Sequence, residues 1–510
     1  AVMSMFSGLS NQAWERSFLR PASVVLDMFH PLSRLGANPA LTEGPALKAH
    51  PHRYHAACVR ASTKHATARP FFGEQLCSLD IGSSVGHESR ELGEPRRTAR
   101  MHVVIIGAGI IGLAVAHKLL DQGHAVTLID RGELSAASRG NAGIIAHVDI
   151  QPLASPRMIL QAARWLIDPV GPLSVRPAYL PRLAPWLARF LLASTPSRIE
   201  RSKQGIIPLQ LMALPAWERL LSRLGLRREL NRNGMLYVFE SIEAFEAMKP
   251  VYREQVELGI QLELVDGTVL RTLEPALSDR FQRAAFFPGV AHVNDPFDLA
   301  VKLTSAASDR GAQLVEGSVS GIAIASGDEP IVVLEGGRTI SADRIVVAAG
   351  AWSKRLAACL GDKIPLDTER GYNTTIPAPG VTLSRPVMFE EHAFVLSPLR
   401  TGLRVGGAVE LASTSASPNW QRVEAMLAKA QAFVPGLRDE GRVDWMGCRP
   451  SLPDSLPVIS TARWSSKVVY AFGHAHHGLT QAAITAELVG ALVAEQAPPI
   501  DLTPYNAQRF

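Results

Sequence analysis

The stretch that decides the fold is His102-Val103-Val104-Ile105-Ile106-Gly107-Ala108-Gly109-Ile110-Ile111-Gly112. Its apolar start, Val103–Ile106, is typical of a strand that is buried on both faces. The glycines that follow fit G-x-G-x-x-G. The first glycine makes a tight turn, the second lets the backbone approach a pyrophosphate, and the third lets helix and strand pack closely.

The residues after the glycine turn complete a right-handed βαβ unit. Residues 110–122 predict a helix and Ala125–Ile129 a second buried strand. Asp130 ends that strand, where its carboxylate can accept from ribose hydroxyls and disfavours a 2′-phosphate. The alternative is a glycine turn without a ligand. The sequence therefore predicts a dinucleotide site, formed by Gly107, Ala108, Gly109, Ile110, Ile111, Gly112, Asp130 and Arg131.

Composition excludes several classes of protein. Hydrophobic residues make up 47% and charged residues 19%, an ordinary globular balance. The net charge is +5, but residues 1–100 hold 12 Lys and Arg against 8 Asp and Glu, so the main body offers no basic surface for nucleic acid. The four cysteines show neither a disulfide framework nor metal-ligand spacing, so we expect no metal and a reducing compartment. No run of about 18 apolar residues predicts a transmembrane helix.

Residues 1–100 differ from the rest because they lack sustained helix or strand periodicity. We interpret them as a poorly ordered extension, or upstream sequence ahead of a start at Met101. A targeting leader is the alternative. The arginine content fits a leader, whereas the acidic residues argue against a transit peptide.

Three further segments carry a family resemblance. They are Ala137–Gly143 (ASRGNAG), Ala342–Ser353 (ADRIVVAAGAWS) and Gly473–Thr480 (GHAHHGLT). With the glycine turn they span about 400 residues, and the chain from Met101 resembles the D-amino-acid oxidase superfamily of FAD-dependent oxidoreductases. Within it the chain is most similar to the bacterial D-amino acid dehydrogenase small subunit and to D-hydroxyproline dehydrogenase-like proteins.

The resemblance implies FAD as the cofactor. The residues it places against FAD beyond the glycine turn are Ser138, Asn141, Ala142, Gly143, Val319, Ala349, Gly350, Trp352, Gly478, Leu479 and Thr480. A helix that begins near Gly478 would direct its positive end at the N1–C2 carbonyl edge of the flavin. Sarcosine oxidases attach FAD through a cysteine, but alignment on Pro453-Asp454 puts that cysteine at Gly447 rather than Cys448. We therefore expect non-covalent FAD.

The resemblance also implies a substrate carboxylate. Trp445–Asp454 (WMGCRPSLPD) resembles the family segment G-x-R-P…P-D, whose arginine pairs with that carboxylate. Arg449 is then the anchor, with a structural ion pair as the alternative. Arg370-Gly371-Tyr372 resembles a family R-G-Y segment that enters the substrate domain, and Tyr372 could hydrogen-bond the same carboxylate or be a core or rim tyrosine. His476 lies in a group with His474 and His477, which could suggest a metal site, but nothing else in the sequence supplies metal-ligand spacing. We therefore expect His476 to be a polar residue near the flavin.

We expect an α/β fold with two domains. A discontinuous, Rossmann-like FAD-binding domain would comprise residues 101–232, 295–365 and 441–510. A substrate-binding domain with an antiparallel sheet and helices would comprise residues 233–294 and 366–440.

The expected reaction is the FAD-dependent oxidative deamination of a D-amino acid or a secondary amino acid. Hydride would pass from the α-carbon to flavin N5, and electrons would then pass to a quinone or another respiratory-chain acceptor. The alternatives are an oxygen-using glycine- or sarcosine-type oxidase, the flavin subunit of a heteromeric amine dehydrogenase, and an NAD dehydrogenase. Residues 180–191 predict an amphipathic basic helix that can lie on a membrane or pack on the protein's own core. We expect a cytoplasmic protein, peripheral on the cytoplasmic membrane face if that helix binds lipid.

Overall fold

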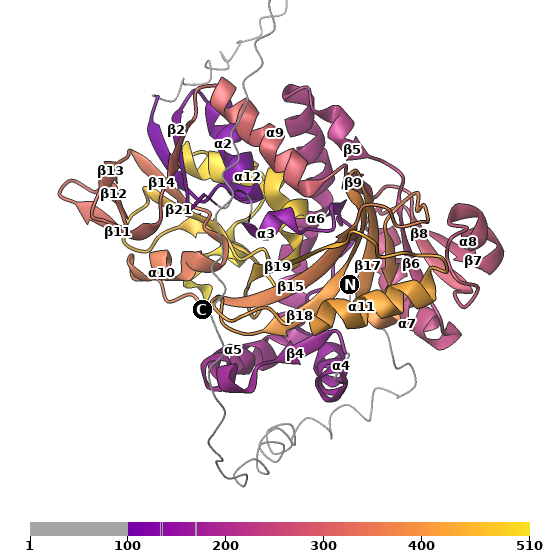
Figure 1. The fold of residues 1–510 in the computed structure, drawn as a ribbon. Helices are drawn as coiled ribbons and strands as arrows, with labels where there is room; N and C mark the ends of the chain where they lie inside the picture. Colours follow the sequence, from indigo (N-terminus) through magenta and orange to yellow (C-terminus); the bar gives the residue numbers. More distant parts are fainter. Residues whose placement is uncertain (1–99, 133, 135, 169–170) are drawn as a thin grey trace, which may run out of the picture. The chain divides into compact units, whose positions relative to one another are not determined.

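The computed structural model describes residues 100–132, 134, 136–168 and 171–510. The expectations for residues 1–99 lie outside the described part. The described elements run from a strand at His102 to short helical turns at the carboxyl end (Figure 1).

The first sheet contains the glycine turn and has the strand order β10-β2-β1-β14-β21-β20. Its strands are β1 (His102–Ile106), β2 (Ala125–Asp130), β10 (Gln313–Glu316), β14 (Arg344–Val347), β20 (Val458–Thr461) and β21 (Val468–Phe472). All neighbouring pairs are parallel except β20 with β21. The predicted βαβ unit is confirmed, and the strands join three separate parts of the chain.

The two faces of this sheet pack against different layers. Val103 and Ile105 lie in a core with helices α2 (Ile110–Asp121), α6 (Pro196–Arg223), α9 (Pro296–Asp309) and α12 (Gly478–Val493). Val104 and Ile106 lie in a second core. That core contains α10 (Ser353–Ala358) and an antiparallel sheet of β11 (Val319–Ala325), β12 (Glu329–Leu334) and β13 (Thr339–Ser341). Helices and a small sheet therefore enclose the parallel strands (Figure 1).

The second sheet has nine strands in the order β19-β15-β18-β17-β16-β6-β8-β7, with β4 also paired to β18. These strands are β4 (Leu173–Val175), β6 (Met235–Phe239), β7 (Glu263–Asp266), β8 (Arg283–Phe287), β15 (Asp367–Ile376), β16 (Val387–Phe389), β17 (Phe394–Leu399), β18 (Gly402–Leu411) and β19 (Val443–Ser451). We expected an antiparallel sheet, but β16 runs parallel to β6 and β4 parallel to β18. The chain between β6 and β16, and that between β4 and β18, is long enough to allow these parallel pairs.

Two segments outside the expected substrate-binding domain contribute strands to the nine-stranded sheet. Residues 441–510 were assigned to the FAD-binding domain, yet β19 forms the edge of the nine-stranded sheet beside β15. Residues 101–232 were assigned there too, yet β4 joins β18. A small sheet of β3 (Ile144–Ile145), β5 (Leu230–Asn231) and β9 (Ala291–Val293) is built from segments of both expected domains.

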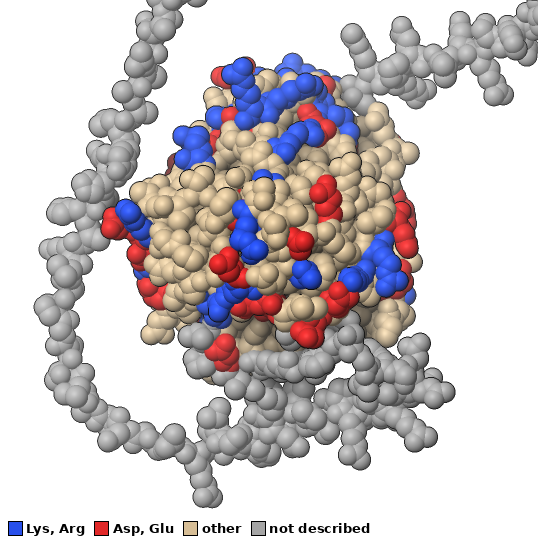
Figure 2. Space-filling model, turned by 90° about the vertical axis from the view of Figure 1, so that its right-hand side faces the viewer, with Lys and Arg blue, Asp and Glu red and all other residues tan. Residues whose placement is uncertain are grey.

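The remaining helices cover the nine-stranded sheet. They are α4 (Pro156–Ile167), α5 (Leu180–Ala193), α7 (Ile242–Glu257), α8 (Gly267–Leu273) and α11 (Gln421–Phe433), while α3 (Ala136–Arg139) lies near β19. Helix α11 packs on β15 and β18, and α5 packs its buried side chains against Leu411 at the end of β18. Within the described residues, no helix is both long and apolar enough to span a membrane. On the face drawn in Figure 2, basic and acidic side chains are interspersed, with Lys and Arg grouped near its upper edge.

Candidate active site

The glycine turn between β1 and α2 has the geometry that the motif requires. Gly107 has φ of +109°, and an added Cβ would come within 2.5 Å of the Ala348 carbonyl oxygen. A Cβ on Gly112 would come within 1.9 Å of the Gly107 carbonyl oxygen. At Gly109 the nearest atom to an added Cβ is the Ser138 hydroxyl, 3.9 Å away. The first and third glycines are therefore needed for packing, and the second leaves room for a phosphate group beside the helix.

Two predicted polar residues meet this helix end. The Asp130 carboxylate accepts a hydrogen bond from the Ala108 N–H at 2.8 Å, so it braces the turn at the end of β2. The Ser138 hydroxyl accepts one from the Ile110 N–H at 3.3 Å. No side chain caps the helix at Gly109. Backbone N–H groups, helix dipole and carboxylate thus gather where a pyrophosphate and a ribose would lie.

Arg131 and Trp352 form the next contact along this edge of the sheet. The Arg131 guanidinium lies over the Trp352 ring, 3.8 Å from its centroid. Val319 and Ala349 pack into the same core beneath them. Gly350 has φ of +55° and open space where a Cβ would stand. The structure therefore brings together five predicted cofactor residues, which lie on β11 and directly after β2 and β14.

The predicted segment Asn141–Gly143 is held by residues that the sequence did not single out. The Asn141 side chain accepts from the Gly143 N–H at 2.8 Å, and Ala142 packs on a neighbouring core. Arg404 on β18 donates to the Asn141 carbonyl oxygen at 2.6 Å. Burial lowers the pKa of Arg404 to about 10, so it stays charged at neutral pH. Asn373 on β15 donates to the Gly140 carbonyl oxygen at 2.8 Å. No local motif marks these two residues, because their role depends on long-range packing.

The start of α12 lies against the same segment. Helix α12 begins at Gly478, directly after a 3-10 turn at Ala475–His477. The Thr480 hydroxyl accepts from the Ala146 N–H at 3.0 Å, and the Leu479 carbonyl accepts from the Trp217 indole at 2.8 Å. Gly478, Leu479 and Thr480 are therefore close to β3, and the free N–H groups of α12 begin there.

Arg449 lies on the sheet face that points toward the cofactor segments. It stands opposite Glu369 in the β15–β19 register, but its guanidinium reaches along the sheet to Gly371. A Cβ on Gly371 would be 2.5 Å from Arg449 Cζ and Nη2. Within the described residues, Arg449 makes no ion pair within 4.0 Å, so the structural ion pair that we weighed is not seen. Burial lowers the pKa of Arg449, and the negative charge of Glu369 opposes this shift.

Trp445 shares this face of β19 and was not singled out from the sequence. Its ring lies across the α-carbons of two glycines. A Cβ would come within 1.9 Å of the ring at Gly447 and within 2.0 Å at Gly140. Glycine at both positions lets α3, the Asn141–Gly143 segment and β19 approach each other closely. The sequence did offer a way to find Trp445, because this residue is the first of the segment Trp445–Asp454 that contains Arg449.

The expected role of Tyr372 is corrected by the structure. Tyr372 is fully buried in the core beneath α11, and its hydroxyl donates to Glu410 at 2.6 Å. The same hydroxyl accepts from the Asn419 N–H at 3.0 Å. Side chains alternate along a strand, so Tyr372 points away from the face that carries Gly371 and Arg449. It is the core tyrosine that we weighed as the alternative.

Cys448 follows the same alternation. It stands opposite Arg370 in the β15–β19 register, is buried, and is next to Arg449 in the chain. Its thiol therefore points to the far face of the sheet. This placement supports the expectation of non-covalent FAD. Within the described residues, no cluster of three His, Cys, Asp or Glu side chains is placed to hold a metal ion.

His476 and its neighbours are packed in the 3-10 turn before α12. The His476 and His477 rings have centroids 3.9 Å apart. Burial lowers the pKa of His476 well below its ordinary value, and it lowers the pKa of His477 to about 4 and that of His474 to about 3. The His474 ring pairs with the Thr485 hydroxyl and His477 with the Gln210 amide. The three imidazoles are neutral at pH 7.

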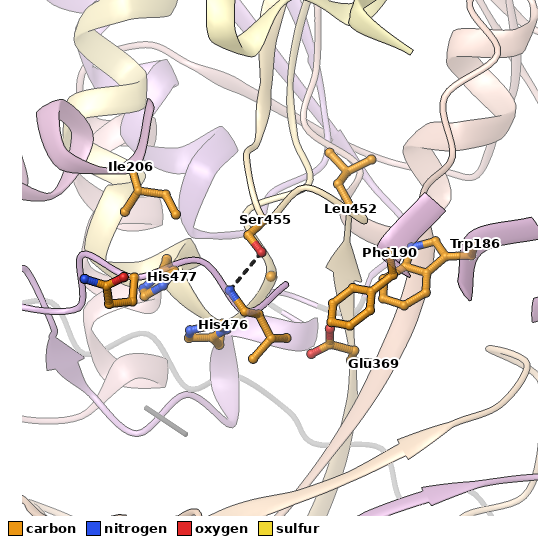
Figure 3. A pocket seen from close by; sticks show the side chains of 11 residues that line it. Trp186, Phe190, Ile206, Glu369, Leu452, Ser455, His476 and His477 are labelled. Atoms are coloured by element: carbon orange, nitrogen blue, oxygen red, sulfur yellow. Dashed lines mark hydrogen bonds between the residues drawn. The ribbon is translucent and has the colours of Figure 1, made fainter. Parts of the chain in front are cut away.

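A pocket opens between this turn, the beginning of β15 and helix α5 (Figure 3). Its polar walls include Glu369, Ser455, His476 and His477, and its apolar walls include Trp186, Phe190, Ile206 and Leu452. Arg449 does not line it, but the charge of Arg449 acts on two residues that do, Glu369 and His476. Sequence reasoning missed Glu369, because only the pairing of distant strands brings it to this wall.

Helix α5 was weighed as a membrane-binding helix, and its placement supports the alternative. Leu183 is fully buried and Trp186 is 8% exposed, in one core with Leu411. Trp186 and Phe190 stack with centroids 5.2 Å apart and form one wall of the pocket. The side of the helix that carries Leu183 and Trp186 therefore packs on the protein itself, whereas Leu191 is 43% exposed.

Comparison with known proteins agrees with this geometry. The family model described as FAD dependent oxidoreductase, DAO, matches residues 102–492. The chain belongs to this family of FAD-dependent oxidoreductases. A D-amino-acid oxidase of Bradyrhizobium diazoefficiens is 36% identical over 80% of this chain and 99% of that protein. A D-amino acid dehydrogenase of Cereibacter sphaeroides is 30% identical over 80% of this chain and 95% of that protein. The crystal structure of glycine oxidase from Geobacillus kaustophilus has a TM-score of 0.64 at 22% identity, covering 81% of this chain and 99% of that chain.

Membership of the FAD-dependent oxidoreductase family confirms the expected fold class, enzyme class and cofactor. The residues fit the cofactor. A Cβ would meet nothing within 4 Å at Gly350 and only the Ser138 hydroxyl, at 3.9 Å, at Gly109, and the N-cap residue Gly109 makes no side-chain cap. The α2 turn would hold the pyrophosphate and Asp130 the ribose, while the Asn141–Gly143 segment and the start of α12 would hold the flavin.

Proposed function

We propose that this FAD-dependent oxidoreductase oxidises the carbon–nitrogen bond of a D-amino acid or a secondary amino acid. The observation that carries the proposal is Arg449, whose guanidinium lies over Gly371 without a partner among the described residues, beside the pocket. A planar guanidinium binds a carboxylate through two parallel hydrogen bonds, which fixes its orientation as well as its position. The relatives named D-amino-acid oxidase and D-amino acid dehydrogenase support this substrate class.

In this proposal FAD supplies the hydride acceptor, and the protein supplies positioning. Arg449 holds the carboxylate, so the α-carbon is fixed relative to the cofactor. Trp186 and Phe190 exclude water from the pocket and pack against the substrate side chain. The neutral imidazole of His476 adds a polar group without adding positive charge beside Arg449. The imino acid product then hydrolyses in water.

Anaerobic flavin bleaching tests the reaction. Purified protein is mixed without oxygen with D-amino acids, D-proline, D-hydroxyproline, glycine and sarcosine, and the flavin absorbance is followed. Bleaching by one class identifies the substrate. A chain that binds FAD but stays oxidised with all of them would instead support the flavin subunit of a heteromeric dehydrogenase.

For the electron acceptor we propose a quinone or another respiratory-chain component. The relative named D-amino acid dehydrogenase supports this choice, and the one named D-amino-acid oxidase supports oxygen as the alternative. The test is to mix substrate-reduced protein with air-saturated buffer or with a soluble quinone. Reoxidation by oxygen within the turnover time, with stoichiometric peroxide, would overturn the proposal.

For the location we propose the cytoplasm, with contact to the cytoplasmic face of a membrane if a quinone is the acceptor. Leu183 cannot test membrane contact, because it is part of the core. Leu191 and Leu192 on α5 are 43% and 53% exposed and are the residues to change. Replacing both with Glu should lower binding to anionic vesicles without affecting FAD content. Equal vesicle binding would exclude this helix as the contact.

A further inference from the structure

Glu369 is a buried carboxylate at the pocket wall, and among the described residues it has no cationic partner within ion-pair distance. It is 7% exposed, and it stands directly opposite Arg449 in the strand register. The two would pair across the strands if the Arg449 side chain extended straight over, but the guanidinium lies over Gly371 instead. Within the described residues, no ion pair within 4.0 Å joins them. The pocket region therefore holds two opposite charges that are not paired with each other.

The other groups that face Glu369 cannot neutralise it. From the turn before α12 come His476 and His477, which burial keeps neutral. From its own strand comes Asp367, whose carboxylate accepts from the Tyr179 hydroxyl at 2.8 Å. Helix α5 contributes no charge to the wall, only the rings of Trp186 and Phe190, which line the same pocket as Glu369 (Figure 3). Aromatic faces next to a carboxylate are surroundings that suit a cationic nitrogen.

We propose that Glu369 binds the amino nitrogen of the substrate and takes the proton that this nitrogen must lose before oxidation. The inference rests on the function proposed above. Arg449 and Glu369 together form a clamp for a zwitterion, in which the carboxylate meets the guanidinium and the ammonium meets the carboxylate. The ammonium then meets Glu369 at the pocket wall and the carboxylate meets Arg449 beside the pocket, so both substrate charges are matched.

The step balances in atoms and charge. An N–H bond of the ammonium breaks and an O–H bond forms on Glu369, which leaves a neutral amine and a carboxylic acid. The freed nitrogen lone pair would then be available to form the C=N bond of an iminium ion, for which bound FAD would supply the acceptor of the α-hydrogen as hydride. Glu369 releases its proton to water after the product leaves. Burial raises the pKa of Glu369, while the Ser451 hydroxyl and the charge of Arg449 lower it. The effect of burial is the larger one, so the Glu369 carboxylate has an increased affinity for the proton of the ammonium.

A basic substrate side chain is the competing ligand for Glu369. A dibasic amino acid with both nitrogens protonated would bring one positive charge more than Arg449 and Glu369 can balance. A neutral amino acid brings equal charges, so the observed pair of groups favours the amino nitrogen as the ligand. Replacement of Glu369 should then affect neutral and basic substrates alike.

The test is Glu369→Gln, assayed with a neutral substrate found by flavin bleaching. The wild type accepts the ammonium form, so its kcat/KM should stay level below the pKa of the substrate amine. The variant can use only the neutral amine, so its kcat/KM should fall about tenfold for each pH unit below that pKa, or about 100-fold two units below it. The loss should vanish as the pH approaches that pKa. A loss of equal size at every pH would mean a structural role and would overturn the proposal.

Ligand binding to the oxidised protein gives a second measurement that does not depend on turnover. The probe is the carboxylic acid that matches the substrate but lacks its nitrogen, followed by flavin absorbance. Glu369→Gln should bind this acid at least as tightly as the wild type, whereas Arg449→Lys should bind it more weakly. Weaker binding to Glu369→Gln would overturn the assignment. Glu424→Gln, on the exposed side of α11, is the matched control and should behave as wild type.

Two outcomes separate this inference from the function on which it rests. If no amino acid bleaches the wild-type flavin, the proposed function fails. If wild type is active and Glu369→Gln keeps the wild-type pH profile, only the role of Glu369 fails. A loss confined to basic substrates would assign Glu369 to a side-chain nitrogen and overturn the proposal in its present form.

Discussion

Replacing Gly371 with Ala should remove most of the activity by displacing Arg449. The added methyl carbon would lie 2.5 Å from Arg449 Cζ and Nη2 and 2.7 Å from Nε. Ordinary contact begins at about 3.4 Å, so the guanidinium must move by about 1 Å. A misplacement of this size in a positioning group can cost about 100-fold in rate. Gly371 does not have a positive φ, so the backbone itself accepts alanine.

The assay compares kcat/KM, FAD content and the midpoint of thermal unfolding in wild type and Gly371→Ala. We expect kcat/KM to fall about 100-fold, with FAD content unchanged. Gly321→Ala is the matched control, since a Cβ on this strand glycine would lie 3.6 Å from Cys359 Sγ, an ordinary contact. Arg449→Lys should lose roughly 1.5–3 kcal/mol of binding, or about 10- to 100-fold, because lysine lacks the planar fork. Full activity in a folded Gly371→Ala variant would refute the role of this guanidinium, and loss of FAD would make Arg449 a cofactor or folding residue.

Three further predictions concern the cofactor, the chain start and acid stability. Acid precipitation should release all FAD from wild type and from Cys448→Ser, because the thiol points to the far face of the sheet; flavin that stays with the protein pellet would show a covalent bond. A chain that begins at Met101 should fold and bind FAD, because the described elements begin at His102; an insoluble or colourless product would give residues 1–100 a structural role. Burial holds the pKa of His292, His474 and His477 near 4, 3 and 4, against an ordinary value of 6.5. Between these values the unfolded chain binds more protons than the folded chain, so the free energy of unfolding should fall as pH drops from about 6.5 toward 4. Each histidine contributes up to about 1.4 kcal/mol per pH unit, and urea unfolding that is equal at pH 7 and pH 5 would contradict this.

The dinucleotide turn could be predicted because its information is local. Gly107, Gly109, Gly112 and Asp130 lie within one βαβ unit, and each glycine is required by a contact inside that unit or by the ligand. The pairing of β15 with β19 could not be predicted in this way, because the two strands are about eighty positions apart in the chain. Only their register shows that Glu369 stands opposite Arg449 and that Gly371 makes room for the guanidinium.

Tyr372 shows why a motif can name a segment correctly and still give a wrong residue. Arg370, Gly371 and Tyr372 are consecutive, so on an extended strand at most the first and third, or the second alone, can face the cofactor. The sequence does not reveal which, because β15 is buried along nearly its whole length and shows no alternation of polar and apolar residues. The Arg449 contact settles it. Gly371 lies under the guanidinium, so Tyr372 and Arg370 must point to the other face, where both bind Glu410.

Helix α5 raises the same question on a larger scale. Its amphipathic pattern predicts that one side is buried, but a pattern cannot say whether lipid or protein covers that side. Here the answer depends on β4, a three-residue strand that pairs with the end of β18 and so brings α5 against Leu411. With α5 in place, Trp186 and Phe190 close the pocket beside Glu369. The short strand, the aromatic wall and the buried carboxylate are therefore linked, so shortening β4 should change substrate specificity as well as stability.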